Sequence, residues 1–516
     1  MLRQASRSFL RPVSIRPVHY GLGRHQKLTP AVKFHSTPRS QALLPLVASI
    51  LKASTALEFT RTAGRIAMTF IPVILVGNYK SRKCIKHAAL HGVQTSEEKV
   101  NKMLKKIRSR TLMINFLFLV PFTLFWATVI ASLERTPLTG RWRMIILSPE
   151  EEEEIAQQLA GPGWYRVVED ILRQDGTPRY VPSSDWRYAW VSETLRRLEA
   201  TVPILLRESE MCQDWSERGP DDLPMPPPAE YPLTPRPRAS EFLHRLVCNR
   251  KPQSVQTFVG PPYSLLLVER PDAPNAFSHG FGPDGGGGIV VYSGFLDEIF
   301  TKYPMQYEDA PVEKDRSWWS QMFGNLFSSS NTSAARPKPT HEQSTELAIL
   351  LAHELSHLIL SHHLETLSSS TVVVPGFLSI AADVIRVLIF PITMMFGPFV
   401  NDAVAQLGKV GSGELIKIGE HCNGWKQEIE ADVVSARLLA HAGFDARKAI
   451  KFWEERVPVG CSSPRKDGDG YMSKGMMGES HPLNETRVER FKEELQRWED
   501  ERLAMLARRR PYQPIS

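Results

Sequence analysis

Three residues near the middle of the chain have the types and spacing of a hydrolytic metal site. His353, Glu354 and His357 form the pattern HExxH. On a helix, two histidines four residues apart share one face, so both imidazoles can reach one zinc ion. Glu354 follows the first histidine directly, where its carboxylate can take a proton from water at the open coordination position. The pattern predicts one zinc ion per chain; the alternative is a solvated polar helix face.

A catalytic zinc site needs a third protein ligand. His362 and His363 are nearby, but Leu360 stands where the metzincin pattern has glycine. We therefore expect the helix to continue past this point and to carry His363 away from the metal. Both histidines are expected to face solvent or to lie outside the ligand set.

The better candidate for the third ligand is Glu428, in the segment "WKQEIEADVVSARLLAHAGF". Glu428 and Asp432 are four residues apart and share a helix face, whereas Glu430 points elsewhere. We expect Glu428 to bind the metal and Asp432 to accept the outer N–H of a ligand histidine. The alternative is an exposed acidic helix face.

Capping and strand patterns predict the elements that would position these groups. Thr340 and Gln343 form a capping box just before the HExxH helix. Upstream, "QTFVG" and "SLLLVE" are typical of strands, and the glycines at 285–288 lead into the β-branched run "IVVYSGF" and a helix. The prediction is an α+β fold, mostly helical, with a small sheet beside the active-site helix.

Three motifs together, "HELSH", "EIEAD" and "HPLNETR", resemble the gluzincin membrane peptidases, which include the CaaX prenyl endopeptidases and the bacterial HtpX-like proteases. The resemblance implies a zincin-type metallopeptidase domain with Glu428 as third zinc ligand and Asp432 as its supporting acid. It also implies that His481 stabilises the oxyanion and that Arg487 anchors that segment. The segments "PNAF" and "IVVYSGF" resemble the family's strand region, whose exposed edge can bind substrate as an added strand.

Residues 111–133 are 23 uncharged, mostly apolar positions, which is enough to span a bilayer. The segment before them, "NKMLKKIRSR", is basic, so the positive-inside rule places that side in the matrix if the protein is mitochondrial. The run at 66–77 is shorter and contains Pro72, which favours a partly inserted or interfacial segment.

The N-terminus accounts for the basic character of the chain. Residues 1–57 contain nine Lys and Arg and no acid, so removing them changes the formal net charge from +7 to −2. This argues against a nucleic-acid partner. The same composition, rich in Arg and Ser, is typical of a mitochondrial transit peptide. The five cysteines form no CxxC pair, so neither a cysteine zinc site nor a disulfide framework is indicated.

Composition shifts suggest the remaining boundaries. A membrane-contacting hairpin and a core helix pair are equally compatible with the apolar insert inside the peptidase domain. The expected segments are a transit peptide and basic region (1–57), a matrix-side segment (58–110), a transmembrane helix (111–133), a helical linker with a Pro-rich connector (134–239), the zinc metallopeptidase domain (240–500) with its apolar insert (371–400), and a basic tail (501–516).

These features together resemble the mitochondrial inner-membrane branch of the family, whose activity overlaps that of the m-AAA protease. The expected function is a zinc endopeptidase that cleaves inner-membrane proteins, with its catalytic domain in the intermembrane space and the lipid bilayer as a partner. A homo-oligomer is compatible with the sequence. Two alternatives remain: a CaaX prenyl-protein endopeptidase of the endoplasmic reticulum, and a non-catalytic membrane scaffold with a closed, four-ligand zinc site.

Overall fold

The computed structural model describes residues 54–92, 96–174, 176–217, 222–233, 260–282, 284–308, 336–369, 424–456 and 485–509. Within these residues the fold is α+β and mostly helical, with small sheets, as the sequence predicts. The predicted strand "QTFVG" and the apolar insert 371–400 lie outside this part of the chain.

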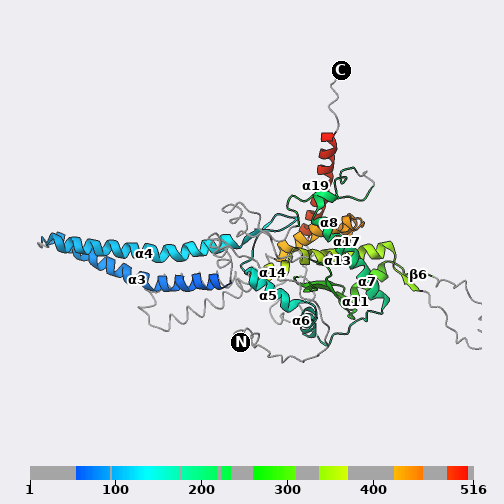
Figure 1. Ribbon diagram of the computed structural model, residues 1–516, viewed down its shortest axis with the longest axis horizontal. Coiled ribbons are helices and arrows are strands. Elements are labelled where there is room, and N and C mark those ends of the chain that lie inside the picture. The colour runs from blue at the N-terminus through cyan, green and yellow to red at the C-terminus, as the bar shows by residue number, and fades with distance from the viewer. Residues whose placement is uncertain are drawn as a thin grey trace, which may run out of the picture. The chain divides into compact units, whose positions relative to one another are not determined.

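Two long helices, α3 (Ser54–Leu90) and α4 (Glu97–Ser132), run side by side, drawn in blue and cyan in Figure 1. Among the residues that the structure describes, α4 is the helix long and apolar enough to cross a membrane. Large apolar side chains on α4 are exposed; Phe116, for example, is 67% accessible. The apolar run 66–77 lies within α3, so it forms part of a longer helix.

Contacts at two levels set the register of this helix pair. In the interior of both helices, Asn78 of α3 donates a hydrogen bond to Thr111 of α4 (3.4 Å). At the start of α3, Leu57 is buried against Ile146, with Phe125 of α4 packed on the same cluster. The start of α3 therefore contacts the chain that follows α4.

Directly after α4 the chain forms a short antiparallel hairpin of β1 (Leu133–Arg135) and β2 (Trp142–Met144). The sequence pattern in this region predicts only helices and a connector. Leu138 and Gly140, both with positive φ, close the hairpin turn. We call the segment 133–144 the post-membrane hairpin.

Between residues 149 and 211 of the described chain, five helices follow this hairpin. The first one begins after Ser148, its N-cap, which forms a reciprocal capping box with Glu151. Segment 134–239 is more than a linker, since Leu195 and Leu198 are buried in the main core. The helices are α5 (Pro149–Leu159), α6 (Pro162–Arg173), α7 (Trp186–Glu199), α8 (Val202–Leu205) and α9 (Glu208–Met211).

The main sheet has the order β3-β5-β4: β3 (Ser264–Val268) is parallel to β5 (Gly287–Tyr292), and β4 (Ala276–Gly280) is antiparallel to β5. Every residue of β5 is buried, which explains its continuous apolar run. A side chain at Gly288 would clash with the Ser264 carbonyl and the Trp164 ring, so glycine lets α6 pack closely on the sheet. The outer edge of β3 is partly covered by residues 179–181, while β4 forms the other edge.

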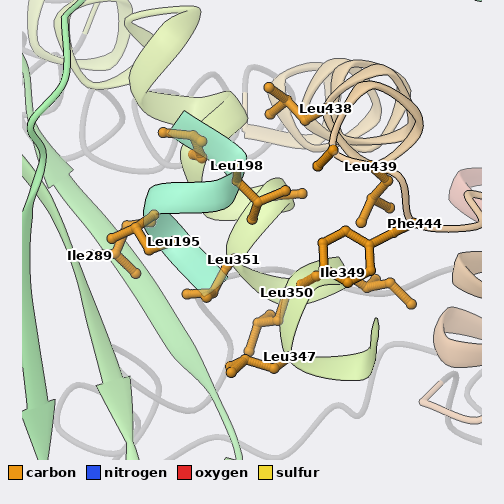
Figure 2. Packing of buried hydrophobic residues seen from close by; sticks show 14 of the residues in the cluster. Leu195, Leu198, Ile289, Leu347, Ile349, Leu350, Leu351, Leu438, Leu439 and Phe444 are labelled. Carbon is orange, nitrogen blue, oxygen red and sulfur yellow. The ribbon is translucent and has the colours of Figure 1, made fainter. Parts of the chain in front are cut away.

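The HExxH helix is α13 (His341–Ile359), which begins at the predicted capping box of Thr340 and Gln343. It packs on β4, β5 and α7. Figure 2 shows Leu347 and Leu351 of α13 in this core with Leu195 and Ile289. Leu438 and Leu439 come from a further helix at residues 424–441.

The remaining elements complete the domain around α13. The helix at 485–509 includes the first nine residues of the predicted basic tail, 501–516. These elements are α11 (Ser293–Lys302), β6 (Gln306–Glu308), β7 (Arg336–Lys338), α14 (His362–Ser368), α17 (Lys448–Glu454) and α19 (Glu485–Arg509).

Candidate metal centre

The polar residues of HExxH lie inside the protein. His353 and Glu354 are completely inaccessible and His357 is 7% accessible. Almost every residue of α13 after its first turn is buried, so its apolar residues meet the core on several sides. A solvated polar face is therefore excluded, and the buried polar groups need partners.

Helix 424–441 supplies the main partner, Glu428, which lies between the two histidines. His353 Nε2 is 3.2 Å from His357 Nε2 and 3.2 Å from one Glu428 oxygen. His357 Nε2 is 3.4 Å from the other Glu428 oxygen. Ligands bound tetrahedrally at zinc distances of about 2.0–2.1 Å lie about 3.3 Å apart. Each of these pairwise distances is close to that spacing, and one ligand atom from each of the three residues lies within 4.8 Å of the others, so the group could hold a metal ion.

The charges around these residues also fit a divalent cation. Glu354, Glu428 and Asp432 are carboxylates, Arg487 is a guanidinium, and each is at most 4% accessible. With neutral histidines their formal charges sum to −2. Because unbalanced buried charge is costly, a bound dication would bring this cluster to neutrality. The donor set of two imidazoles and one carboxylate is the one expected for catalytic zinc.

Asp432, one turn after Glu428, holds the outer nitrogen of the first histidine. Its Oδ1 lies 2.9 Å from His353 Nδ1. Burial alone would raise the pKa of Asp432, but the Arg487 charge and the His353 hydrogen bond lower it overall. Asp432 therefore stays ionised and fixes the His353 ring with Nε2 toward Glu428 and His357.

Arg487, from α19, joins the two acids of helix 424–441. It donates two hydrogen bonds to Asp432 (2.7 and 2.8 Å) and lies 3.1 Å from Glu428. Burial would lower the pKa of Arg487, but the charges of Asp432, Glu428 and Glu354 raise it overall. Its guanidinium also lies 5.1 Å from the centre of the Trp453 ring, which packs against His353.

His362 lies close to the centre on the far side of His357. Its Nδ1 is 2.9 Å from His357 Nδ1, the nitrogen that faces away from Glu428. The expectation that the helix continues past Leu360 is wrong, because α13 ends at Ile359 and Ser361 has a left-handed backbone (φ 54°). Arg143 of the post-membrane hairpin donates to the Leu360 carbonyl and so satisfies the helix end in place of a glycine motif.

His363 is directed elsewhere: its Nε2 lies 2.8 Å from the Ser278 carbonyl of β4. Here a cleft of about 410 Å³ lies between β4 and the start of helix 424–441, with His357 and Glu428 among its lining residues. Burial, and then the nearby His363, lower the pKa of His279 on the same strand to about 3. The cleft therefore brings a sheet edge beside the metal-binding groups.

The structure thus brings together five of the seven predicted site residues in direct contacts, namely His353, His357, Glu428, Asp432 and Arg487. Glu354 lies near enough to Arg487 to affect its pKa. His481 lies outside the described residues.

Sequence reasoning missed the position of His362 against His357. The doublet at 362–363 was noticed, but only the end of α13 at Ile359 decides which histidine turns back.

Comparison with known proteins adds a family to this geometry. Residues 242–495 match the model of peptidase family M48. This stretch is therefore similar to the peptidases of family M48. The match supports the general family named from the three motifs, and with it a metallopeptidase. M48 peptidases are generally zinc-dependent, which agrees with the donor set of His353, His357 and Glu428.

The search of curated proteins and the search of solved structures found no match. The M48 match begins after α7, whose Leu195 and Leu198 belong to the same core as α13. The core around α13 therefore includes a helix from outside the matched segment.

Proposed function

We propose that this chain is a zinc-dependent endopeptidase with a zincin-type domain. The observation that carries the proposal is the buried ligand triangle of His353, His357 and Glu428, whose closest distances between side-chain nitrogens and carboxylate oxygens, 3.2 to 3.4 Å, suit one tetrahedral ion. Zinc held by these residues would act as a Lewis acid and make water a stronger nucleophile. The M48 match supports the same class of reaction.

The chain's own residues divide the remaining work. Glu354 accepts the proton of the attacking water and later delivers it to the leaving amine. Asp432 and Arg487 keep His353 and Glu428 in place through the contacts described above. His481 donates to the developing oxyanion, a role carried over from the motif "HPLNETR".

The substrate is an extended polypeptide that lies along β4. β4 is an edge strand of the three-stranded sheet, and its residues 276–279 line the cleft that reaches His357 and Glu428. A chain segment added beside β4 would gain backbone hydrogen bonds independent of its side chains. This suits an enzyme that cleaves unfolded or extended segments of membrane proteins.

The proposed location is the mitochondrial inner membrane, with the peptidase domain in the intermembrane space. The support is the acid-free basic N-terminus, the apolar α4 and the basic segment before it. There the enzyme would take part in stress response and quality control, including processing of a dynamin-like fusion GTPase, with activity overlapping that of the m-AAA protease. A fluorescent reporter fused to residues 1–60 tests the compartment; its location in the endoplasmic reticulum would contradict this placement.

Neither alternative gains support from the described residues. A prenyl-protein endopeptidase would be expected to enclose a chamber with several spans, whereas α4 is the candidate span found in this part of the chain. A closed structural site needs a fourth protein ligand. His362, the residue considered for that role, contacts the opposite nitrogen of His357.

The experiment that tests the activity is the change Glu354→Gln in purified full-length protein. We expect peptide cleavage to fall by about 10²–10⁴-fold, because the general base is lost. Zinc content should stay at the wild-type level, since Glu354 is not in the ligand triangle. Wild-type cleavage by this variant would contradict the mechanism. Quantitative terminomics on mitochondria carrying wild type or Glu354→Gln would then identify substrates.

A further inference from the structure

A second group of buried charged and titratable residues lies next to the proposed metal centre, and the mechanism above does not use it. His362, Glu365 and Glu430 are each at most 5% accessible and lie close enough together to share an ion. However, the Arg141 guanidinium already lies between the two acids, with one nitrogen 2.7 Å from each. This cation pairs with both acids and occupies the space between them, so the group is an ion-pair cluster rather than a second metal site.

The cluster is connected to the metal centre through one histidine. His362 Nδ1 lies 2.9 Å from His357 Nδ1, and His362 Nε2 lies 3.3 Å from Glu430. If His357 offers Nε2 to zinc, its own proton is on Nδ1 and is donated to His362. His362 then carries its proton on Nε2 and donates it to Glu430. Both ring contacts are satisfied by this single arrangement of protons.

The far end of the cluster belongs to the post-membrane hairpin. Arg141 binds Glu365 through two hydrogen bonds (2.9 and 2.7 Å), and Thr139 donates to Glu430. Arg143 is paired with Glu134 of β1 (2.9 Å) and donates to the carbonyl at the end of α13. The segment that follows α4 thus contacts both helices that carry the metal-binding residues.

We propose that His362 is a positioning residue that orients the metal-binding His357. In this arrangement Glu430 of helix 424–441 holds His362, and Arg141 of the post-membrane hairpin holds Glu430. The two histidines of HExxH would then be held in parallel ways, His353 by Asp432 directly and His357 by Glu430 through His362. The inference rests on the proposed zinc site, and it adds a path by which α4 can influence that site.

Zinc affinity of the full-length protein in detergent, measured by competition with a chromophoric chelator, tests the proposal. We expect His362→Gln and Glu430→Gln each to weaken zinc binding by about 10–100-fold, the usual effect of removing a group that orients a ligand. Arg141→Lys, which keeps the charge, should weaken it less than Arg141→Gln. The matched control is His341→Gln, which removes an exposed histidine from the first turn of α13 and should bind zinc like wild type.

Two further measurements separate positioning from folding and from activity. The melting temperature with excess chelator reports folding without zinc, and the absorption spectrum of the cobalt-loaded protein reports ligand geometry. A changed cobalt spectrum in His362→Gln supports positioning. Wild-type zinc affinity and a wild-type cobalt spectrum in both His362→Gln and Glu430→Gln would overturn it. If wild type binds zinc tightly but cleaves no peptide, the proposed function fails while zinc affinities still decide the role of His362.

Discussion

At the scale of single residues, Arg487 lowers the electrostatic cost of burying three acids, Glu354, Glu428 and Asp432, when no metal is bound. Replacing it by methionine changes the formal charge of the cluster from −2 to −3. Breaking a buried ion pair typically costs about 3–5 kcal/mol, so Arg487→Met should lower the free energy of unfolding by about that amount in chelator. Zinc should restore part of the loss, because a dication is attracted more strongly to a cluster of charge −3 than to one of charge −2. Thermal melts with and without zinc measure both effects.

The control for this change is Arg490→Met on the same helix. Arg490 is exposed and pairs with Glu493 on the surface, where an ion pair contributes at most about 1 kcal/mol. Equal melting temperatures for the two variants would show that Arg487 does not carry the charge balance assigned to it.

The grouping of His353, His357 and Glu428 was predictable from the sequence, but the residues that contact them were only partly so. HExxH and ExxxD each lie within one helix, where the period of 3.6 residues fixes which side chains share a face. Glu430 was correctly expected to point away from Glu428. Its partner Arg141 could not be found, because Arg141 is 289 positions from Glu430 along the chain. The turn before His362 could not be predicted either, because Ser361 adopts a left-handed backbone without being a glycine.

At the scale of elements, α9 fixes helix 424–441 through a buried carboxylate. Glu208 accepts hydrogen bonds from Arg437 (2.8 Å) and the Ala229 backbone (2.8 Å), and lies 2.8 Å from His441. Burial would raise the pKa of Glu208, but His441 and Arg437 lower it overall. The stabilising contribution is therefore present above the ordinary pKa of about 4.5 and is lost as the pH falls through the lowered value.

Glu208→Gln should consequently destabilise the protein by about 3–5 kcal/mol at pH 7, because it leaves Arg437 buried without its carboxylate. Below about pH 4.5 the difference from wild type should shrink. Denaturant unfolding at several pH values measures this, with the exposed neighbour Glu210→Gln as control. A difference that stays constant down to pH 3 would contradict the role of ionised Glu208.

Element boundaries were predicted well where the signal was local. The capping box of α13 appears where its sequence places it. The post-membrane hairpin was missed, because strands of three residues carry almost no periodic pattern and form here through contacts with the end of α13.

At the scale of the whole molecule, the helix pair makes a prediction about membrane sidedness. Cys84 is exposed near the end of α3 that is joined to α4, beyond the apolar stretch. If α4 crosses the bilayer, a membrane-impermeant maleimide applied on the peptidase side should not label Cys84. A cysteine at the exposed position Glu342 should react from that side. Peptide mapping of labelled, sealed membranes identifies each site, and equal labelling of both would contradict a spanning α4.

Leu57, near the start of the described chain, packs against Ile146, which follows α4. If α4 crosses the bilayer, α3 passes through the same layer, because it packs along α4 with Asn78 beside Thr111. The described stretch 54–90 and 96–132 then crosses the bilayer twice. The uncharged stretch 66–79 is about 21 Å long, shorter than a bilayer core of about 30 Å, so Arg65 must reach the interface with its long side chain. A cysteine at Glu58 should accordingly react from the same side as one at Glu342, and the residues at the tip of the pair would be the part of the protein exposed to the other compartment.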